Sequence, residues 1–250
     1  MLKKLLASVG IGKARVDAIL LSDTLQAGQP FEVKVEIQGG EVEQQIQGLA
    51  FAIMAKAKTT VSTAEHDREV QKSVVLQEWW QDLDMTVQAG ERLSKTFTLN
   101  LHPEVPASEL AGRSIAKVWL QTGIDIKNGV DGSDNDPLVI LPSPTQLAVL
   151  NYISQSGYRL FKSDIEKGQV RAPGFVSHLP CYQEYEFKPD SFSLFGVREI
   201  EVTFVSNGLE TGVLLEIDRA FKGDGYQSIS IPNHCTSIED VKPYMARILG

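Results

Sequence analysis

The densest group of oxygen-bearing side chains lies at residues 131–137, which read Asp-Gly-Ser-Asp-Asn-Asp-Pro. A calcium loop of the EF-hand type needs oxygen ligands at alternate positions, a glycine at the sixth position and a glutamate at the twelfth. Counted from Asp131, these two positions hold Asp136 and Pro142, so the template fails. The same residue types are the usual turn formers. We therefore predict a turn without a metal ion, and keep Asp131, Asp134 and Asp136 as candidate interaction residues.

Two histidine–cysteine pairs, His178 with Cys181 and His234 with Cys235, offer four side chains of the kind that bind zinc. The first spacing is acceptable for a zinc site. The second is not, because adjacent residues on an extended chain point to opposite sides. We expect both cysteines to be small buried apolar residues, and a disulfide between them is disfavoured in a reducing cytoplasm.

Nucleophilic catalysis has no recognisable motif in this chain. The sequence contains neither a G-x-S-x-G elbow nor a phosphate-binding loop ending in G-K-[ST]. The histidines are scattered over positions 66, 102, 178 and 234, where we expect surface residues. We predict no catalytic residues, no cofactor and a non-enzymatic protein, while a pair of carboxylates that meet in space would remain invisible to this reasoning.

The adjacent tryptophans Trp79 and Trp80 are candidate contact residues. Consecutive side chains on a strand face opposite ways, so one ring can be exposed and can anchor a partner or a sugar. The alternative, which we favour, places one ring in the core and the other under a loop. Trp119 lies between Val118 and Leu120 and is expected inside a sandwich.

Composition restricts the class of protein. The chain has 250 residues, of which 42% are hydrophobic, and a formal net charge of −8 at neutral pH. This length suits one large β domain or two ordinary ones, and either can bury a core without disulfides or metals. An acidic surface repels phosphate backbones, so nucleic acid is not an expected partner. No stretch approaches the roughly 18 apolar residues of a transmembrane helix.

The N-terminal segment, residues 1–9, combines an apolar stripe with a lysine pair and could form a short amphipathic helix. Its candidate contact residues are Lys3, Lys4, Leu5 and Leu6. We expect this helix to dock on its own domain, with contact to a partner, or to a membrane surface, as alternatives. Its apolar run is too short for a signal peptide, and two cysteines are few for a secreted protein, so we expect a cytoplasmic protein.

Most of the chain has the period of β-strands. In residues 31–38 every second side chain is apolar, which predicts a strand with one buried and one wet face, ended by the Gly39-Gly40 turn. Further strands are expected at residues 16–20, 49–57, 69–77, 93–101, 116–126 and 138–141. Many short strands separated by turn signals are typical of a β-sandwich.

The pattern changes near Pro142-Ser143-Pro144, which we interpret as a linker or a helix start. A helix is predicted up to about Ser156, stopped by Gly157, and a closing helix over 237–249 with Ser237 as its N-cap. Five strands are expected between them, at residues 158–165, 183–188, 197–205, 212–218 and 226–231. The predicted domains are therefore residues 1–142, nearly all β, and residues 143–250, a smaller β domain with flanking helices.

Several short stretches together resemble one family. They are residues 3–12 followed by Val16-Asp17, Gly28-Gln29, Gly39-Gly40, residues 124–126 leading to 131–137, residues 187–189 and residues 215–219. With these stretches the chain resembles the bacterial sporulation-control proteins of the stage-zero sporulation protein M group. None of the stretches is a catalytic signature, and the resemblance supplies no catalytic residues.

The resemblance implies an arrestin-like N-terminal β-sandwich joined to a second, smaller β-sandwich-type domain with a few short helices. It also implies a regulatory or scaffold protein that acts through protein–protein interaction. On this reading the 131–137 loop could also serve as a charged element between the domains. The competing hypothesis is a calcium- or carbohydrate-binding β-sandwich, module or enzyme, that uses the aspartates of this loop and Trp79-Trp80.

Overall fold

The structure is a computed structural model of the chain and describes residues 14–62, 67–127, 132–191, 196–220 and 223–249. The predicted helix at residues 1–9, with Lys3, Lys4, Leu5 and Leu6, lies outside these ranges, as does Asp131. Within the described residues, no helix is long and apolar enough to cross a membrane.

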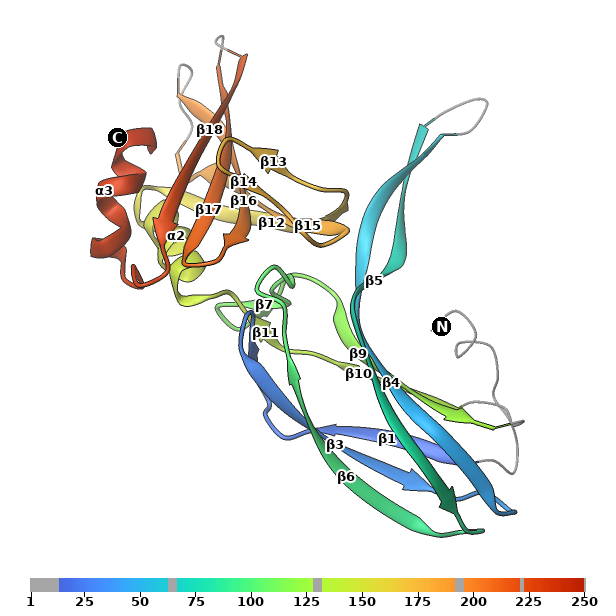
Figure 1. Cartoon of the computed structure of the whole chain (residues 1–250). Coiled ribbons are helices and arrows are strands. Elements are labelled where there is room, and N and C mark those ends of the chain that lie inside the picture. The colour runs from blue at the N-terminus through green and yellow to red at the C-terminus, as the bar shows by residue number, and fades with distance from the viewer. Residues whose placement is uncertain (1–13, 63–66, 128–131, 192–195, 221–222, 250) are drawn as a thin grey trace.

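The first half of the chain forms two antiparallel sheets packed face to face (Figure 1). One sheet has the order β1-β3-β6, and the other layer has the order β10-β9-β4 with β5 beside β4. Their bounds are Arg15–Leu20 (β1), Pro30–Gln38 (β3), Gln44–Ser62 (β4), Asp67–Val87 (β5), Arg92–Asn100 (β6), Val118–Ile126 (β9) and Gly132–Pro137 (β10). Because β3 alternates buried and exposed residues, as predicted, its apolar face reaches the core between the sheets.

The second half forms one antiparallel sheet backed by two helices (Figure 1). Its elements are α2 (Pro144–Gln155), β12 (Tyr158–Lys167), β15 (Cys181–Pro189), β16 (Val197–Asn207), β17 (Glu210–Arg219), β18 (Gly223–Pro232) and α3 (Ile238–Leu249). The inward side chains of the sheet and of both helices fill a second hydrophobic cluster. The described chain is mainly β with two short helices, which confirms the predicted fold class and is consistent with an arrestin-like arrangement.

Three two-stranded pairs complete the fold. They are β2 (Leu25–Gln26) with β11 (Ile140–Leu141), β7 (Glu109–Leu110) with β8 (Arg113–Ser114), and β13 (Arg171–Ala172) with β14 (Phe175–Val176). The expected strand at 138–141 is thus only two residues long. β4 and β5 are instead much longer than predicted and form a hairpin that extends beyond the sandwich (Figure 1).

The helix signals were predicted correctly because they are local. Ser143 caps α2 in a capping box with Gln146, and Gly157 follows the helix with a φ of +91°. At α3, the Ser237 hydroxyl donates to the Asp240 carboxylate at 2.7 Å and accepts from the Asp240 N–H at 3.3 Å. Each helix therefore begins where its side chains satisfy the first free N–H groups.

The turn predicted at residues 131–137 is wrong for residues 132–137, which form the edge strand β10. This strand pairs with β9 from Gly132 opposite Ile124 to Pro137 opposite Trp119. The turn-forming residues are tolerated here because β10 is short and lies at a sheet edge, with its proline at the last position.

We call residues 14–142 the first lobe and residues 143–249 the second lobe (Figure 1). Strands of the two lobes meet at a single parallel pair, Glu166 on β12 opposite Lys58 on β4. The hydrophobic core of the first lobe also includes Leu179 and Cys181 of the second. The two lobes thus share buried surface, and their division into separate domains at 142/143 remains a prediction.

Candidate functional site at the junction of the two lobes

Glu104 forms one of the short polar contacts between the lobes. It follows β6 in the first lobe, and its side chain is only 4% exposed. Its carboxylate accepts hydrogen bonds from the backbone N–H of His178 at 2.7 Å and of Leu179 at 3.2 Å. The His178 ring completes the contact, with 2.9 Å between its Nδ1 and Glu104 Oε1. Because an ionised carboxylate only accepts, His178 must carry its proton on Nδ1.

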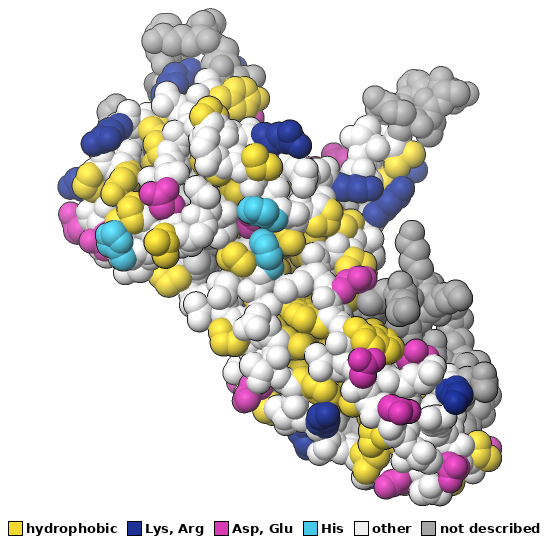
Figure 2. Space-filling view, in the orientation of Figure 1, with side chains coloured by type: hydrophobic (Ala, Val, Ile, Leu, Met, Phe, Trp, Pro, Cys, Tyr) yellow, Lys and Arg dark blue, Asp and Glu magenta, His cyan; other side chains and the backbone are white. Residues whose placement is uncertain are grey.

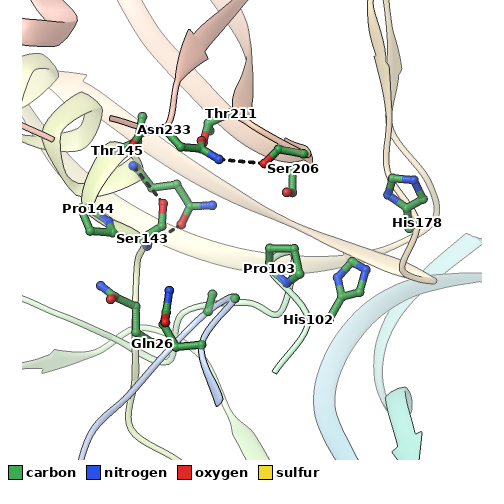
Figure 3. A pocket seen from close by; sticks show the side chains of 15 residues that line it. Gln26, His102, Pro103, Ser143, Pro144, Thr145, His178, Ser206, Thr211 and Asn233 are labelled. Carbon is green, nitrogen blue, oxygen red and sulfur yellow. Dashed lines mark hydrogen bonds between the residues drawn. The ribbon is translucent and has the colours of Figure 1, made fainter. Parts of the chain in front are cut away.

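His102 lies next to this contact, and Figure 3 shows it beside His178. The ring centroids of His102 and His178 are 6.1 Å apart. Nδ1 of His102 accepts the backbone N–H of Glu104 at 3.1 Å, so the neutral ring carries its proton on Nε2. Burial lowers the pKa of His102, and the neighbouring His178 lowers it further, against an opposing effect of Glu104. Histidine side chains are visible at the waist between the lobes in Figure 2.

Nitrogen and oxygen atoms of His102, Glu104 and His178 lie within 4.8 Å of one another, close enough for a divalent cation. In the hydrogen-bonding arrangement just described, however, Nδ1 of each histidine already has a partner and Nε2 of His102 carries a proton. Nε2 of His178 carries no proton in this arrangement, but a cation bound also to His102 would have to displace the proton on its Nε2 or the hydrogen bond to its Nδ1. The cluster therefore acts as a clasp between the lobes, which we call the Glu104 clasp.

A buried amide supplies a second contact across the junction. Gln183 on β15 accepts from the Ala107 N–H at 2.8 Å and donates to the Ala107 carbonyl at 2.9 Å. The same side chain is held by the hydroxyls of Ser163 and Tyr185, each at 2.9 Å. The primary amide thus pairs with the backbone of the first lobe as a neighbouring strand would, and leaves no buried polar group of Ala107 unsatisfied.

Lys58 on β4 supplies the ionic contact. Its ammonium group lies 2.7 Å from Asp164 and 3.8 Å from Glu166, both on β12, and 3.0 Å from Glu69 on β5. Burial alone would lower the pKa of Lys58, but the hydrogen bonds to Asp164 and Glu69 raise it above its usual value. The lysine therefore stays charged and joins the long hairpin to the sheet of the second lobe.

A cavity of about 580 Å³ opens beside the clasp (Figure 3). Its lining comes from both lobes: residues 26–29, 102, 103, 143–146, 178, 206, 208, 211 and 233. None of these is Asp, Glu, Lys or Arg. Asn233 is held by Thr211, whose hydroxyl donates at 2.7 Å, and donates in turn to the Gly208 carbonyl at 3.0 Å. Apart from the histidines, these lining residues offer no group for acid–base chemistry.

The structure places Trp79 and Trp80 on opposite faces of β5, in the first lobe. Trp79 packs edge-on against Phe31 with ring centroids 6.3 Å apart, against the core. Trp80 is 37% exposed, and its indole N–H donates to Asp82 at 2.7 Å. A Cβ on Gly48 would lie 2.4 Å from the Trp80 ring, so this ring rests on the backbone of β4. The Trp79 ring is thus partly buried against the core, while the Trp80 ring lies over a glycine and not under a loop.

Asp134 and Asp136 lie on β10, where all their described contacts are within the first lobe. Asp134 accepts the backbone N–H of Ala18 on β1 at 3.0 Å. Burial, then the charge of Asp134 and then that of Asp17, raise the pKa of Asp136 to about 7. These contacts give no support to the hypothesis of a charged element between the domains, because Asp134 joins β1 to β10 within the first lobe.

The cysteines are separated, as expected of structural residues. Cys181 is 1% exposed in the first hydrophobic cluster, and Cys235 is 4% exposed in the second. Both are free thiols. The four residues considered for zinc are therefore not brought together, and the prediction of small buried cysteines is confirmed.

Sequence reasoning missed an acidic sheet face in the second lobe, which we call the open face. It is the face of the sheet opposite α2 and α3, and one row across its five strands reads Lys162, Glu186, Glu201, Glu216 and Tyr226. Burial and neighbouring glutamates raise the pKa of Glu184 and of Glu201 to about 7. The alternation of glutamates with apolar residues in β15, β16 and β17 is the signal that could have predicted this face.

The fold and the junction define a two-lobed, mainly β protein whose lobes are joined through a shared core and buried polar contacts. Within that class the chain belongs to the SpoOM protein family, which matches residues 2–221. This confirms the family predicted from the short stretches.

Two similar proteins extend this result. The sporulation-control protein spo0M of Bacillus subtilis (strain 168) is 30% identical over 253 residues, which cover 96% of this chain and 93% of the relative. The crystal structure of Spo0M, sporulation control protein, from Bacillus subtilis aligns with a TM-score of 0.77 at 24% identity, over 96% of this chain and 98% of that one. The structural likeness shows that the two chains share a fold.

Proposed function

We propose that this protein is a non-enzymatic regulator that acts in the cytoplasm by binding other proteins, in a pathway that controls sporulation. Its similarity to a sporulation-control protein along nearly the whole chain supports the pathway. The observation that carries the mode of action is the use of the ionisable groups at the junction. Glu104, His178 and Lys58 bind the lobes to each other, and of the three only His178 lines the neighbouring cavity, with its Nδ1 engaged by Glu104.

We further propose that residues 1–142 and 143–250 are two domains that present their surfaces as one rigid unit. The Glu104 clasp, the amide of Gln183 and the salt bridges of Lys58 all cross the junction. A partner that contacts both domains would then meet a fixed arrangement, which lowers the entropic cost of binding.

One observation favours the competing calcium-binding function. Oδ2 of Asp136 is buried without a hydrogen-bond partner in the described structure, next to the carboxylates of Asp134 and Asp17. A cation there would relieve the repulsion between these groups. Calcium titration followed by thermal unfolding tests this, because a bound ion raises the melting temperature and Asp136→Asn abolishes the rise. No rise at millimolar calcium contradicts it.

Affinity purification after cross-linking in the native host tests the main proposal. The bait is the full chain, compared with a chain lacking residues 1–9 and with the charge variant Lys3→Glu, Lys4→Glu. We expect a small, reproducible set of proteins with the full chain. Loss of part of this set with both altered chains would assign a contact to the N-terminal segment. Recovery of background alone with every bait contradicts the proposal.

A further inference from the structure

The first lobe carries a second cavity, of about 660 Å³, on the outer face of its β10-β9-β4 layer. Val118 and Leu120 of β9 belong to the first hydrophobic cluster, so Trp119 between them points to the opposite face. Trp119 lines the cavity, and the prediction of its ring inside the sandwich is therefore wrong. Because β9 pairs with β4 on one side and with β10 on the other, the ring stands on a fixed strand.

The lining of this cavity is mostly apolar. Trp119 and Pro137, which are neighbours across the β9–β10 ladder, form part of it. Much of the rest comes from β7, β8 and the segments that flank β9 and β10, including Ala116 and Val139. Cavities of about 300–1,000 Å³ with apolar and aromatic linings and a few polar groups are typical of small-molecule sites.

One polar group in the lining, the hydroxyl of Ser108, is already satisfied by the protein. It donates to the backbone carbonyl of Leu138 and accepts the backbone N–H of Ile140 at 2.8 Å. A ligand that hydrogen-bonded to this hydroxyl would have to displace one of these contacts. The polar selectivity of the cavity therefore depends on its charged residues.

Three charged residues line the cavity, and they are Lys56, Lys117 and Glu109. Within the described residues, none of the three forms a salt bridge. The ammonium group of Lys56 donates to the hydroxyl of Ser73 at 2.9 Å and lies 6.0 Å from the centroid of the Trp119 ring. Two positive charges against one negative favour an acidic ligand, although the whole chain has a net charge of −8.

The charge of the lining also argues against one occupant from the chain itself. The N-terminal segment, residues 1–9, is apolar but contains Lys3 and Lys4 and no acidic residue. Its charge has the same sign as the net charge of the lining, so its entry into the cavity would be opposed by repulsion.

We propose that this cavity, which we call the Trp119 cavity, binds a small organic acid with an apolar body, of which a medium-chain fatty acid is the simplest. The chain lies against Trp119, and the carboxylate lies at Lys56 and Lys117. Burial of the chain supplies the affinity, and the lysines supply the orientation and the preference for an acid. This site is separate from the proposed function and does not depend on it.

Calorimetric titration of the full chain at pH 7 tests the proposal with three ligands that share one alkyl chain: octanoate, octan-1-ol and octylamine. A carboxylic acid is ionised at this pH and an alkylamine is protonated, so only the head-group charge changes. We expect octanoate to bind about fivefold more tightly than the alcohol, and the amine to bind most weakly. Failure of octanoate to bind, or equal binding of the alcohol or the amine, overturns the proposal.

Two lysine variants locate the carboxylate. Lys117→Gln should weaken octanoate binding about threefold and leave the alcohol unchanged. Lys127→Gln is the matched control, because Lys127 is also exposed but follows the opposite end of β9. It should bind both ligands like the unaltered chain. An equal effect of the two substitutions would mean that net charge alone attracts the acid, which overturns the site.

Quenching of tryptophan fluorescence by ω-bromooctanoate locates the chain, since bromine quenches an indole only at short range. We expect saturable quenching in the full chain. Trp119→Phe keeps an aromatic ring in the lining and leaves Trp79 and Trp80 on β5 as the remaining indoles. Its fluorescence should not be quenched over the same range of concentration. Equal quenching of the two chains overturns the proposal.

A chain lacking residues 1–9 tests the competing occupant. We expect octanoate to bind this chain as it binds the full chain. Binding that appears only after the segment is removed would assign the Trp119 cavity to residues 1–9 and overturn the proposal.

Discussion

Glu104 is the side chain on which the polar contact between the lobes depends most. Its carboxylate accepts two backbone N–H groups and one ring N–H from residues 178 and 179, and it is almost fully buried. The N–H groups it satisfies would be left without a partner if it were lost, which costs more than the bond itself contributes.

We therefore expect Glu104→Gln to lower the free energy of unfolding by about 1–3 kcal/mol, because hydrogen bonds to a neutral amide are weaker than those to a carboxylate and the amide N–H₂ faces the Nδ1–H of His178. Glu32→Gln, an exposed glutamate on β3, is the matched control for loss of charge and should change stability little. Urea unfolding of both variants measures the difference. An equal effect of the two substitutions would show that the clasp does not stabilise the fold.

Glu201 makes the opposite contribution, and its effect depends on pH. Burial and the charges of Glu184 and Glu216 raise its pKa to about 7 from a usual value of 4.5. The folded state thus binds a proton that the unfolded state releases, so stability falls as pH rises from about 5 to 8. Glu201→Gln should stabilise the chain at pH 8 by about 1 kcal/mol, a value reduced because the group is only partly buried.

The gain should disappear at pH 5, because the folded protein then already holds Glu201 protonated and uncharged, as glutamine is. Urea titrations of Glu201→Gln and of the control Glu32→Gln at several pH values between 5 and 8 measure this slope. A gain that is the same at pH 5 and pH 8 would mean that charge on the open face is not its cause.

At the scale of elements, close packing of a ring on a glycine holds the β13–β14 hairpin against the second sheet. A Cβ at Gly212 on β17 would lie 2.6 Å from the ring of Phe175, and all its nearest neighbours are atoms of that ring. We expect Gly212→Ala to destabilise the chain by about 1–3 kcal/mol through overpacking. The smaller side chain of Phe175→Leu should relieve part of the clash, so the double variant should lose less stability than the sum of the single ones. Additive losses would place the strain elsewhere.

Element prediction from sequence succeeded where one local pattern decides the structure. The alternation in residues 31–38 gives β3, and the capping residues Ser143 and Ser237 give the helix starts, because each signal acts within one turn or one strand. It failed at β10, whose turn-type residues are held extended by pairing with β9. Tertiary contact outweighed local preference there.

The junction was beyond sequence reasoning for a related reason. Glu104 and His178 are separated by 74 positions, and nothing in either neighbourhood indicates the other. The two histidines were expected at the surface, yet His102 is half-buried and accepts a backbone hydrogen bond. Such contacts depend on how the two lobes meet, which no local periodicity encodes.

At the scale of the whole molecule, the shared core predicts how the chain unfolds. Leu179 and Cys181 of the second lobe are buried in the first cluster, together with Ile165 of β12. Opening the junction would expose these apolar side chains as well as the partners of Glu104. Unfolding of one lobe alone would therefore also destabilise the other. We expect a single cooperative transition for both lobes.

Two built-in probes can separate the lobes. All three tryptophans, Trp79, Trp80 and Trp119, belong to the first lobe and all six tyrosines to the second, so fluorescence excited selectively at tryptophan reports only the first lobe. Cys235 is buried in the second cluster, and in a Cys181→Ala variant it is the only thiol. Its reactivity toward a thiol reagent therefore reports the second lobe, and the fluorescence of the same variant corrects for any loss of stability.

Urea midpoints from fluorescence and from Cys235 exposure should coincide if the shared core joins the lobes into one unit. Leu179→Ala should then shift both midpoints together, since it removes a side chain of one lobe from the core of the other. Two separate urea midpoints in the chain that keeps Leu179 would mean that each domain unfolds on its own. The lobes would then be free to change their relative position, and a partner that contacts both domains could no longer rely on a fixed arrangement.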